Sequence, residues 1–440
     1  MEYSRMRQSQ RKTNSMYTKL IQEKKLPWDA TLVVAAFPAY GSVSFVGSVL
    51  GGTRAAANMQ IARVHAAMLL EGTLTRDKKE IQLFLDSIGA SVSFSVSRNR
   101  LSFSGRVREK HLDKLLHFVA EALTEPTFPE AELEILKKRD LAAFSLAAQD
   151  THTQADIAFT RLLYTPEHPN YAETTDESRE ALLTTTREEL LAHHARVVGR
   201  QGLILSLAGN ITKTEANKLI EKHFKKLPQK QFKLPTFVKI PPGPSLKKFV
   251  PIEHKASIDF MTGHTTGITS DHKDYPALML GLQILGNPGG FTGRLMTTVR
   301  EEEGLTYGVY AYLSGFTKEI DGYINIWGTF APQLFVQGRE AMLREIKKIL
   351  ADGVTQEEVR KHRELYDARM RVQLANSGAL ARAAHEVIAQ GYAVTRLDEF
   401  PKKVLRLSAK DVNLALKKYL HPDHLSESAA GPVEENSLPA

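Results

Sequence analysis

Arg300 and Tyr307, separated by Glu-Glu-Glu-Gly-Leu-Thr, are the side chains in this sequence best suited to chemistry. A guanidinium supplies fixed donors with a permanent charge, and a phenol supplies one hydroxyl. Such donors stabilise an oxyanion or a peptide carbonyl. We expect Arg300 to close a helix and Tyr307 to open the strand that leaves it, so that both can face one cavity. The alternative is that Arg300 pairs with Glu301 to Glu303 and Tyr307 is a core residue.

The stretch from Asp271 to Trp327 must position this pair. Apolar residues at helical spacing predict a helix with one buried face over Tyr275 to Leu285. The following Gly286-Asn-Pro-Gly-Gly cannot continue a helix, so a turn is expected before a second helix over Gly293 to Glu302. Aromatic and β-branched residues beyond Gly304 predict two paired strands.

The order of elements in the first half returns in the second half. Gly89-Ala-Ser-Val-Ser-Phe, which follows a predicted helix, corresponds to Gly304-Leu-Thr-Tyr-Gly-Val, and Thr186-Arg-Glu-Glu-Leu corresponds to Ala409-Lys-Asp-Val-Asn. The interval, roughly 220 residues, indicates a duplicated domain, because solenoid repeats span roughly 20 to 50 residues. The fold class predicted is α+β, with helices covering one face of a mostly antiparallel sheet in each half. Two such halves facing each other would leave a cleft.

Composition places the boundaries of these halves. A chain of 440 residues is too long for one core, and six prolines between residues 228 and 251 are typical of a linker. We therefore predict a first domain over residues 27–227, a linker over 228–251 and a second domain over 252–425. Residues 1–26 would form an N-terminal extension, and residues 426–440 a C-terminal tail.

Charge and composition exclude several classes of function. The formal charge of +8 is modest for this length, and no basic stripe is interleaved with aromatic residues, so no nucleic-acid partner is expected. The absence of cysteine excludes disulfides and thiolate zinc sites. No apolar run approaches the roughly 18 to 20 residues that cross a bilayer, so no membrane segment is expected.

The N-terminal 27 residues are polar and basic, without the apolar core of a signal peptide. The predicted location is cytoplasmic. A transit peptide is the weaker alternative, because Arg5, Arg7 and Arg11 stand among serines, whereas Glu2 argues against it.

The pattern that leads through Gly293-Arg-Leu to Arg300 and Tyr307 resembles the second half-domain of pitrilysin-type zinc peptidases. This family, the inverzincins, includes mitochondrial processing peptidase. The resemblance covers about Pro27 to Leu425 and implies that the two half-domains form a half-clamshell. In the family, the pair that matches Arg300 and Tyr307 reaches into the active site and supports the substrate carbonyl. The resemblance thus makes them the candidate catalytic residues.

Catalytic members of that family carry His-x-x-Glu-His on a first-half helix, which places two zinc ligands and a base on one face. Alignment on the following Gly-Thr places Arg63, Ala66 and Ala67 at the first His, the Glu and the second His. A guanidinium has no lone pair for a metal, and alanine offers neither a ligand nor a base. His65 lies one residue out of phase, roughly 100° around the helix.

The third zinc ligand of the family, a Glu on the next long helix, also has no counterpart. That helix is predicted as one tract from Glu130 to about Leu163, and Leu141 to Gln149 contains no carboxylate. Other histidine pairs, such as His193-His194 and His421 with His424, lack helical partners and are interpreted as surface or capping groups. No metal is assigned to this chain.

The glycine-rich turn is a second candidate site. It joins two predicted helices, whereas a phosphate-binding loop joins a strand to a helix, so a nucleotide site is rejected. Non-catalytic members of the processing-peptidase family carry a longer glycine-rich loop there that touches substrate. The resemblance therefore implies substrate binding by Gly289, Gly290 and Phe291. The alternative is a turn that simply needs positive φ.

We thus predict a non-catalytic subunit of a heterodimeric zinc metallopeptidase. Arg300 and Tyr307 would complete the active site of a zinc-bearing partner, and an extended peptide would bind by hydrogen bonds to a sheet edge. No cofactor is expected in this chain, and zinc is expected in the partner. The alternatives are a catalytically inert structural or assembly protein, and a zinc-free peptide-binding protein or homodimer. Retention of Arg300 and Tyr307 favours the first hypothesis.

Overall fold

The structure is a computed structural model that describes residues 17–37, 41–230, 233–288 and 290–433. The chain divides into two compact units that are not contiguous in sequence. Unit 1 comprises the described residues of 1–140, 179–235 and 369–402, and unit 2 those of 141–178, 236–368 and 403–440. The chain therefore passes from one unit to the other after residues 140, 178, 235, 368 and 402.

A six-stranded sheet forms the centre of unit 1. Its strands follow the order β1-β2-β6-β3-β5-β4, and only the pair β2–β6 is parallel. Apolar residues such as Phe45 and Phe103 are fully buried in it, as expected of strands covered on both faces. The strands are β1 (Ile21–Leu26), β2 (Ala30–Ala36), β3 (Ser42–Leu50), β4 (Ser91–Val96), β5 (Arg100–Arg108) and β6 (Leu203–Gly209).

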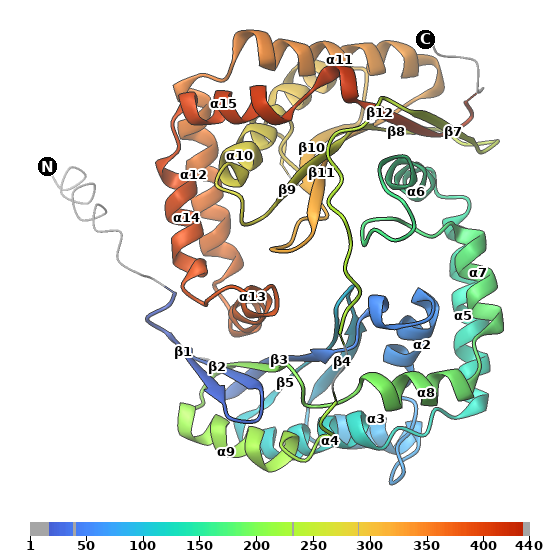
Figure 1. Cartoon of the computed structure of the whole chain (residues 1–440), viewed down its shortest axis with the longest axis vertical. Helices are drawn as coiled ribbons and strands as arrows, with labels where there is room; N and C mark the ends of the chain where they lie inside the picture. The colour runs from blue at the N-terminus through green and yellow to red at the C-terminus, as the bar shows by residue number, and fades with distance from the viewer. Residues whose placement is uncertain (1–16, 38–40, 231–232, 289, 434–440) are drawn as a thin grey trace, which may run out of the picture. The chain divides into compact units, whose positions relative to one another are not determined.

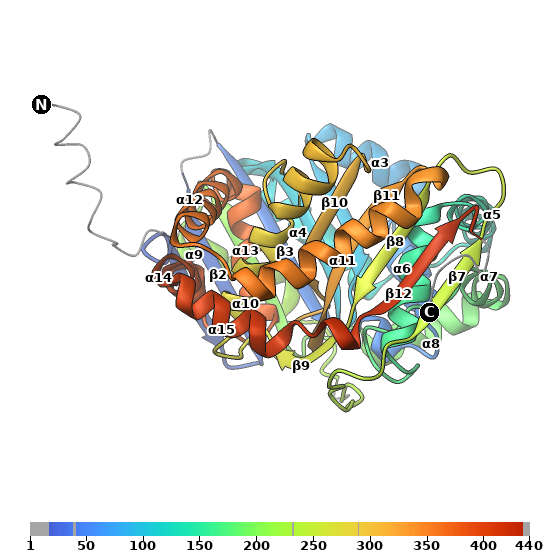
Figure 2. The same cartoon turned by 90° about the horizontal axis from the view of Figure 1, so that it is seen from above.

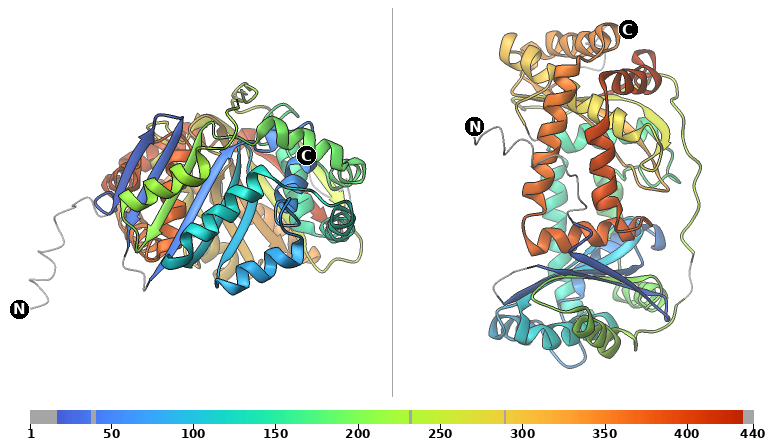
Figure 3. Two further views of the ribbon diagram at one scale, coloured as in Figure 1. Left: turned by 90° about the horizontal axis from the view of Figure 1, so that it is seen from below. Right: turned by 90° about the vertical axis from the view of Figure 1, so that its left-hand side faces the viewer.

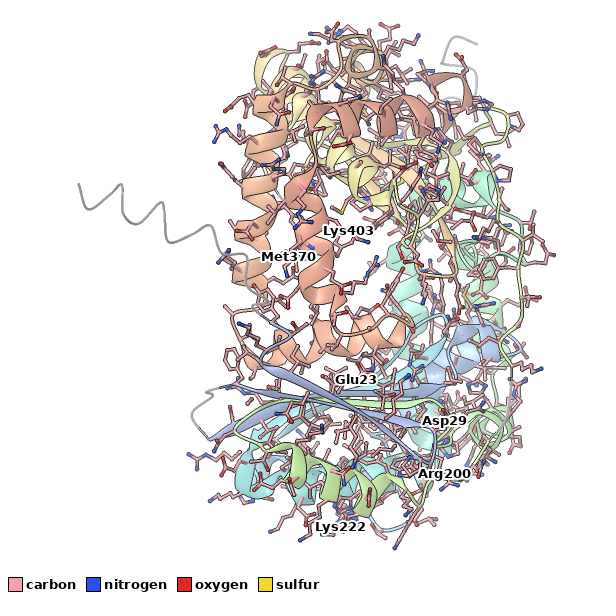
Figure 4. The ribbon with its side chains drawn as sticks, turned by 60° about the vertical axis from the view of Figure 1, so that its left-hand side comes forward. Glu23, Asp29, Arg200, Lys222, Met370 and Lys403 are labelled. Atoms are coloured by element: carbon pink, nitrogen blue, oxygen red, sulfur yellow. The ribbon has the colours of Figure 1, made fainter. Side chains whose placement is uncertain are left out.

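Helices α4 (Leu112–Thr124) and α9 (Lys213–Phe224) cover one face of this sheet, as Figure 1 and the left panel of Figure 3 show. Lys222 of α9, labelled in Figure 4, forms an ion pair of 2.8 Å with Asp113 of α4 at the periphery of the unit. The other helices that lie in or enter unit 1 from the first half are α2 (Met59–Met68), α3 (Lys78–Ser87), α5 (Glu130–Ala147), α7 (Thr175–Thr184) and α8 (Arg187–Val197).

The opposite face of the same sheet is covered by α13 (Ser377–Ala389), which comes from the second half of the sequence (Figure 1). Its Leu380, Ala381 and Ala384 are buried in a core with apolar residues of β2, β3 and β6. Polar contacts also join α13 to β3: the Ser48 hydroxyl lies 2.7 Å from Nε2 of His385. The two alanines allow the helix to approach the sheet closely, because they add little bulk.

Unit 2 contains the second sheet, with the order β10-β11-β8-β12-β7 and β9 also paired with β11. Only the pair β12–β7 is parallel. The strands are β7 (Lys247–Pro251), β8 (Ile258–Gly263), β9 (Thr265–Thr269), β10 (Gly308–Ser314), β11 (Asp321–Phe330) and β12 (Ser426–Gly431).

Helices α10 (Tyr275–Leu285) and α11 (Phe335–Asp352) cover one face of the second sheet, and α11 crosses its strands in Figure 2. The Phe335 ring of α11 lies 5.8 Å from the Phe260 ring of β8, and Arg339 forms a buried ion pair of 2.7 Å with Glu427 of β12. Other helices from the second half of the sequence that lie in or enter unit 2 are α12 (Gln356–Gln373), α14 (Arg396–Arg406) and α15 (Ala409–Tyr419).

The other face of the second sheet is covered by α6 (Thr151–Leu163), which comes from the first half of the sequence. Ala155 and Phe159 are buried against apolar residues of β8, β11 and β12. Thr151 donates a hydrogen bond of 2.5 Å to Asp259 of β8, and Trp327 donates one of 2.7 Å to the same carboxylate. The two units thus each use a helix that the other half of the sequence supplies.

The predicted fold class, α+β with two duplicated half-domains, is confirmed, but helices cover both faces of each sheet where one covered face was expected. The parallel pairs β2–β6 and β7–β12 occupy corresponding places in the two sheets. Gly89, before β4, has φ of 58°, and Gly304, before β10, has φ of 65°. Both positions favour glycine, because other residues rarely adopt this left-handed conformation.

Several elements differ from those expected. The tract from Glu130 to Leu163 is two helices, because Asp150 caps a new helix by accepting a hydrogen bond of 2.8 Å from the Thr153 N–H. The expected linker ends in β7, and the expected C-terminal tail begins with β12, which lies between β7 and β8 in the second sheet. The expected N-terminal extension contains β1, and its first 16 residues lie outside the described residues. The domain boundaries themselves stay a prediction.

We predict that proteolysis cuts first in the proline-rich segment but does not separate the two fragments. The N-terminal fragment would keep α6, which packs in unit 2, and the C-terminal fragment would keep α13, which packs in unit 1. Trypsin-nicked protein should therefore elute from a sizing column as one species without denaturant. The same sample in urea is the control and should give two fragments. Separation under native conditions would contradict the exchange of helices.

Candidate functional site

Three of the residues singled out in the sequence lie together on unit 2. The guanidinium carbon of Arg300 is 4.8 Å from the centre of the Phe291 ring and 5.8 Å from the centre of the Tyr307 ring. Arg300 is half-buried, whereas Phe291 is 68% exposed and Tyr307 is 87% exposed. We call these three residues the Arg300 cluster. A cation held over aromatic faces at such an exposed site gains about 0.5–1 kcal/mol.

The Arg300 cluster is positioned by a π-helix and the turn that follows it. The π-helix spans Met296–Glu302, where a regular α-helix was expected, so Arg300 lies in its last turn. Wide turns of this kind are frequent at functional sites. Gly304, with φ of 65°, then reverses the chain, and β10 begins directly after Tyr307.

Arg294 anchors the start of this region. It donates hydrogen bonds to both carboxylate oxygens of Glu358, of 2.8 and 3.0 Å, and one of 2.6 Å to the Gly353 carbonyl. Burial of Glu358 opposes its charge, but the hydrogen bonds from Arg294 and Thr355 outweigh it and lower the pKa of this carboxyl to about 2. The ion pair therefore stays charged at neutral pH and joins the segment that begins at Arg294 to α12.

The structure argues against the alternative interpretation, in which Arg300 pairs with Glu301 to Glu303 and Tyr307 is a core residue. Tyr307 is exposed and is not a core residue, and Glu303 pairs with Arg344. Within the described residues, no carboxylate pairs with Arg300.

In the glycine-rich turn, the Gly290 N–H donates a hydrogen bond of 3.3 Å to the Asn287 carbonyl, and Gly289 lies outside the described residues. The roles of Arg300, Tyr307, Gly289, Gly290 and Phe291 stay predictions.

The positions that match the zinc motif lie on α2 of unit 1. Arg63 is exposed, Ala66 is buried and Ala67 is half-buried. These side chains offer a metal no ligand, so the residues present do not fit a zinc ion. In the part of the chain that the structure describes, no group of three or more His, Asp or Glu side chains has an arrangement that could hold a metal. That this chain binds no metal stays a prediction.

A cluster of three histidines occupies the buried side of α2. Nε2 of His65 lies 3.0 Å from Nδ1 of His194, and the His65 ring is 5.1 Å from the His193 ring. The Phe128 ring packs on His65 at 5.5 Å. The expectation that His193 and His194 are surface groups was wrong: His193 is buried and His194 is half-buried. No pattern in the sequence indicates this cluster, because α2 and α8 lie far apart along the chain.

Burial keeps these imidazoles neutral. It lowers the pKa of His193 and of His194 to about 4, with Arg196 and Lys230 as the respective neighbouring cations, and it lowers the pKa of His65 well below its usual value. Nδ1 of His65 and Nε2 of His193 have no hydrogen-bond partner in the described residues. The cluster therefore contributes packing and one hydrogen bond between α2 and α8.

Two family models match most of the described chain. One, described as insulinase (peptidase family M16), matches residues 57–165, which include α2. The other, described as the peptidase M16 inactive domain, matches residues 184–366, which include the Arg300 cluster. The chain therefore belongs to peptidase family M16. The pitrilysin-type resemblance of the sequence is confirmed.

Individual relatives carry different names. An uncharacterized zinc protease of Mycobacterium leprae is 23% identical over 344 residues, covering 76% of this chain and 75% of that protein. A non-peptidase homolog of Helicobacter pylori is 24% identical over 305 residues, covering 68% and 67%. The beta subunit of mouse mitochondrial-processing peptidase is 22% identical over 383 residues, covering 83% and 75%.

A solved structure shows the same fold. The crystal structure of a peptidase M16 inactive domain from Pseudomonas fluorescens has a TM-score of 0.84 and 23% sequence identity, and the match covers 94% of this chain and 98% of that one. No described helix of the present chain is both long and apolar enough to span a bilayer. The cytoplasmic location stays a prediction.

We predict that the purified, tag-free chain contains no stoichiometric zinc, because the positions on α2 are Arg63, Ala66 and Ala67. Elemental analysis after dialysis against micromolar zinc measures this directly. An M16 protein with an intact His-x-x-Glu-His motif, treated in the same way, is the control. One zinc per chain that disappears in the variant His65→Phe would overturn the assignment.

We also predict that acid destabilises unit 1 through the histidine cluster. Unfolding restores an ordinary pKa near 6.5, so the unfolded state binds more protons than the folded state between about pH 6.5 and 4. Each such histidine then removes at most about 1.4 kcal/mol of stability per pH unit as the pH falls through this window. His194→Asn should make the fall of the melting temperature between pH 7 and 5 shallower.

The control for this prediction is His254→Asn, because His254 has an exposed side chain outside the cluster. Its melting temperature should follow the wild-type pH dependence. If His194→Asn also follows the wild-type curve, the imidazole of His194 is not neutral in the folded protein and the account of the cluster fails.

Proposed function

We propose that this chain is the non-catalytic subunit of a heterodimeric zinc peptidase. In this proposal it binds peptide substrate and supplies Arg300 and Tyr307 to the active site of a zinc-bearing partner. The observation that carries the proposal is the Arg300 cluster: an arginine and a tyrosine are presented together on the surface, whereas α2 carries no zinc ligand at the motif positions. The chain thus has the M16 fold and the two hydrogen-bond donors Arg300 and Tyr307, but no zinc ligands at the motif positions on α2.

The chemistry of the cluster suits a supporting role. Arginine and tyrosine provide hydrogen-bond donors for the negative charge that develops on a carbonyl oxygen, but neither activates water by itself at neutral pH. Contact with the Phe291 and Tyr307 rings restricts the Arg300 guanidinium before any substrate binds. Donors that are ordered in advance stabilise a transition state at little reorganisation cost.

Strand β4 offers a place for an extended peptide. It is an edge strand, with β5 on one side and no described strand on the other. Its free backbone groups can form the hydrogen bonds by which a peptide adds to a sheet. In this proposal Gly290 and Phe291 of the glycine-rich turn also contact substrate, Phe291 as a member of the Arg300 cluster, and the zinc is held by the partner subunit.

We predict that Arg300→Ala and Tyr307→Phe each slow peptide cleavage by the heterodimer without preventing its assembly. Loss of one oxyanion donor lowers the rate on the order of 100- to 1000-fold, roughly 3–4 kcal/mol. The measurement is turnover at saturating peptide, after the variant is mixed with a zinc-bearing M16 subunit from the same genome and the complex is isolated by sizing. The effect should fall on kcat, because the donors act in the transition state.

Tyr310→Phe is the matched control. It removes a hydroxyl from β10, and the remaining ring can keep its stacking on Trp327, where the centroids are 5.5 Å apart. The control complex should cleave at the wild-type rate. If Arg300→Ala and Tyr307→Phe also assemble and cleave at that rate, the pair is structural, and the inert assembly protein becomes the better account. If no zinc-bearing subunit binds the chain, the heterodimer is excluded.

A further inference from the structure

A groove in unit 1 carries three arginines and a row of serines. It lies between α13 and the strands β3, β4 and β5, and it consists of two adjoining cavities of about 330 and 470 Å³. The cavities share Ser91 and Arg106. Arg382 of α13 lines the first cavity, and Arg108 of β5 lines the second. Cavities of several hundred Å³ hold an extended ligand, since one water molecule needs only about 30 Å³.

Strand register explains how hydroxyls and guanidinium groups come together here. Ser91 of β4 pairs with Arg106 of β5, and Arg106 pairs with Ser44 of β3, so the three side chains form one row on the same face of the sheet. In the next row, the hydroxyls of Ser93 and Ser104 lie 2.9 Å apart. Short hydroxyl side chains leave room above the sheet, whereas the arginines reach into that room.

The groove is positively charged. No carboxylate lines either cavity, and within the described residues Arg106, Arg108 and Arg382 form no ion pair; the polar contact of Arg106 is one of 3.4 Å to the Ser42 hydroxyl. The neighbouring acidic residues bond elsewhere: Glu109 accepts from Asn210, and Glu386 accepts a hydrogen bond of 2.7 Å from Gln390. Exposed guanidinium groups beside hydroxyls favour carboxylate or phosphate oxygens.

The spacing of the arginines matches an extended peptide. Arg106 and Arg108 are two residues apart on β5 and point to the same face, which places them roughly 7 Å apart along the strand. A peptide added to the edge of β4 would direct alternate side chains to that face at the same spacing. A free phosphate could contact one guanidinium but could not follow this row.

We propose that the groove binds an acidic, extended segment of the peptide substrate, with carboxylates at alternate positions bound by Arg106, Arg108 and Arg382. This inference rests on the proposed function, because it names the class of peptide that the chain would take. It assigns no role to the Arg300 cluster. Binding by the isolated full chain is therefore measurable without any zinc-bearing partner.

The test measures fluorescence anisotropy of labelled peptides of one length, which alternate threonine with glutamate, glutamine or lysine. The acidic peptide should bind at least about tenfold more tightly than the glutamine peptide at low salt, and the difference should shrink in 1 M NaCl because salt screens exposed charges. The double variant Arg106→Gln/Arg382→Gln should lose at least about tenfold in affinity for the acidic peptide only.

The matched control is Lys218→Gln, which removes one exposed charge from α9, on the opposite face of the same sheet, and should bind as the wild type does. Equal binding of acidic and glutamine peptides would overturn the acidic preference and leave peptide binding intact. Inorganic phosphate that displaces the acidic peptide completely at equal concentration would show a small-anion site and overturn the proposal. No binding by any peptide would overturn it together with peptide binding in the proposed function.

Discussion

The structure depends on covering the second face of each sheet with a helix from the other half of the sequence. In unit 1, α13 closes the core around β2, β3 and β6, and in unit 2, α6 does the same around β8 and β12. Apolar packing buries most of the contact area, and polar contacts fix the register, such as Ser48 with His385 in one unit and Thr151 with Asp259 in the other. A buried hydroxyl without its partner costs about 1–3 kcal/mol, so a helix shifted by one turn is disfavoured.

The residues that stabilise this fold differ from those that could support a reaction. Helix α2 keeps its place through His65 and the histidine cluster, although Arg63, Ala66 and Ala67 leave no zinc site on it. The contact between α2 and α8 therefore needs no metal. The Arg300 cluster shows the reverse arrangement. Its residues contribute little to the core, because Tyr307 is 87% exposed, so the role that we propose for them would make little demand on the stability of the fold.

Local patterns predicted much of the fold and part of the candidate site. Helix α10 was predicted to the residue, and the turn before Tyr307 followed from Gly304. Long-range pairings could not be predicted, because periodicity identifies an apolar face but not the sheet that it covers; α6 and the histidine cluster at His65 are the clearest cases. Strand β12 was missed because Ser-Glu-Ser-Ala-Ala-Gly has weak strand propensity, and its pairing with β7 and β8 is long-range.

Because unit 1 needs a helix from the second half of the sequence, it cannot be completed until the ribosome has synthesised α13. The last strand of the first sheet ends at Gly209, but the helix that covers its second face is complete only at Ala389. At roughly 5 to 20 residues per second, the ribosome needs on the order of 10 to 40 seconds to add that intervening chain. During this time α13 is not yet available to cover the apolar residues that it buries in the folded protein. This interval is when a chaperone that recognises exposed β-sheet would have its target.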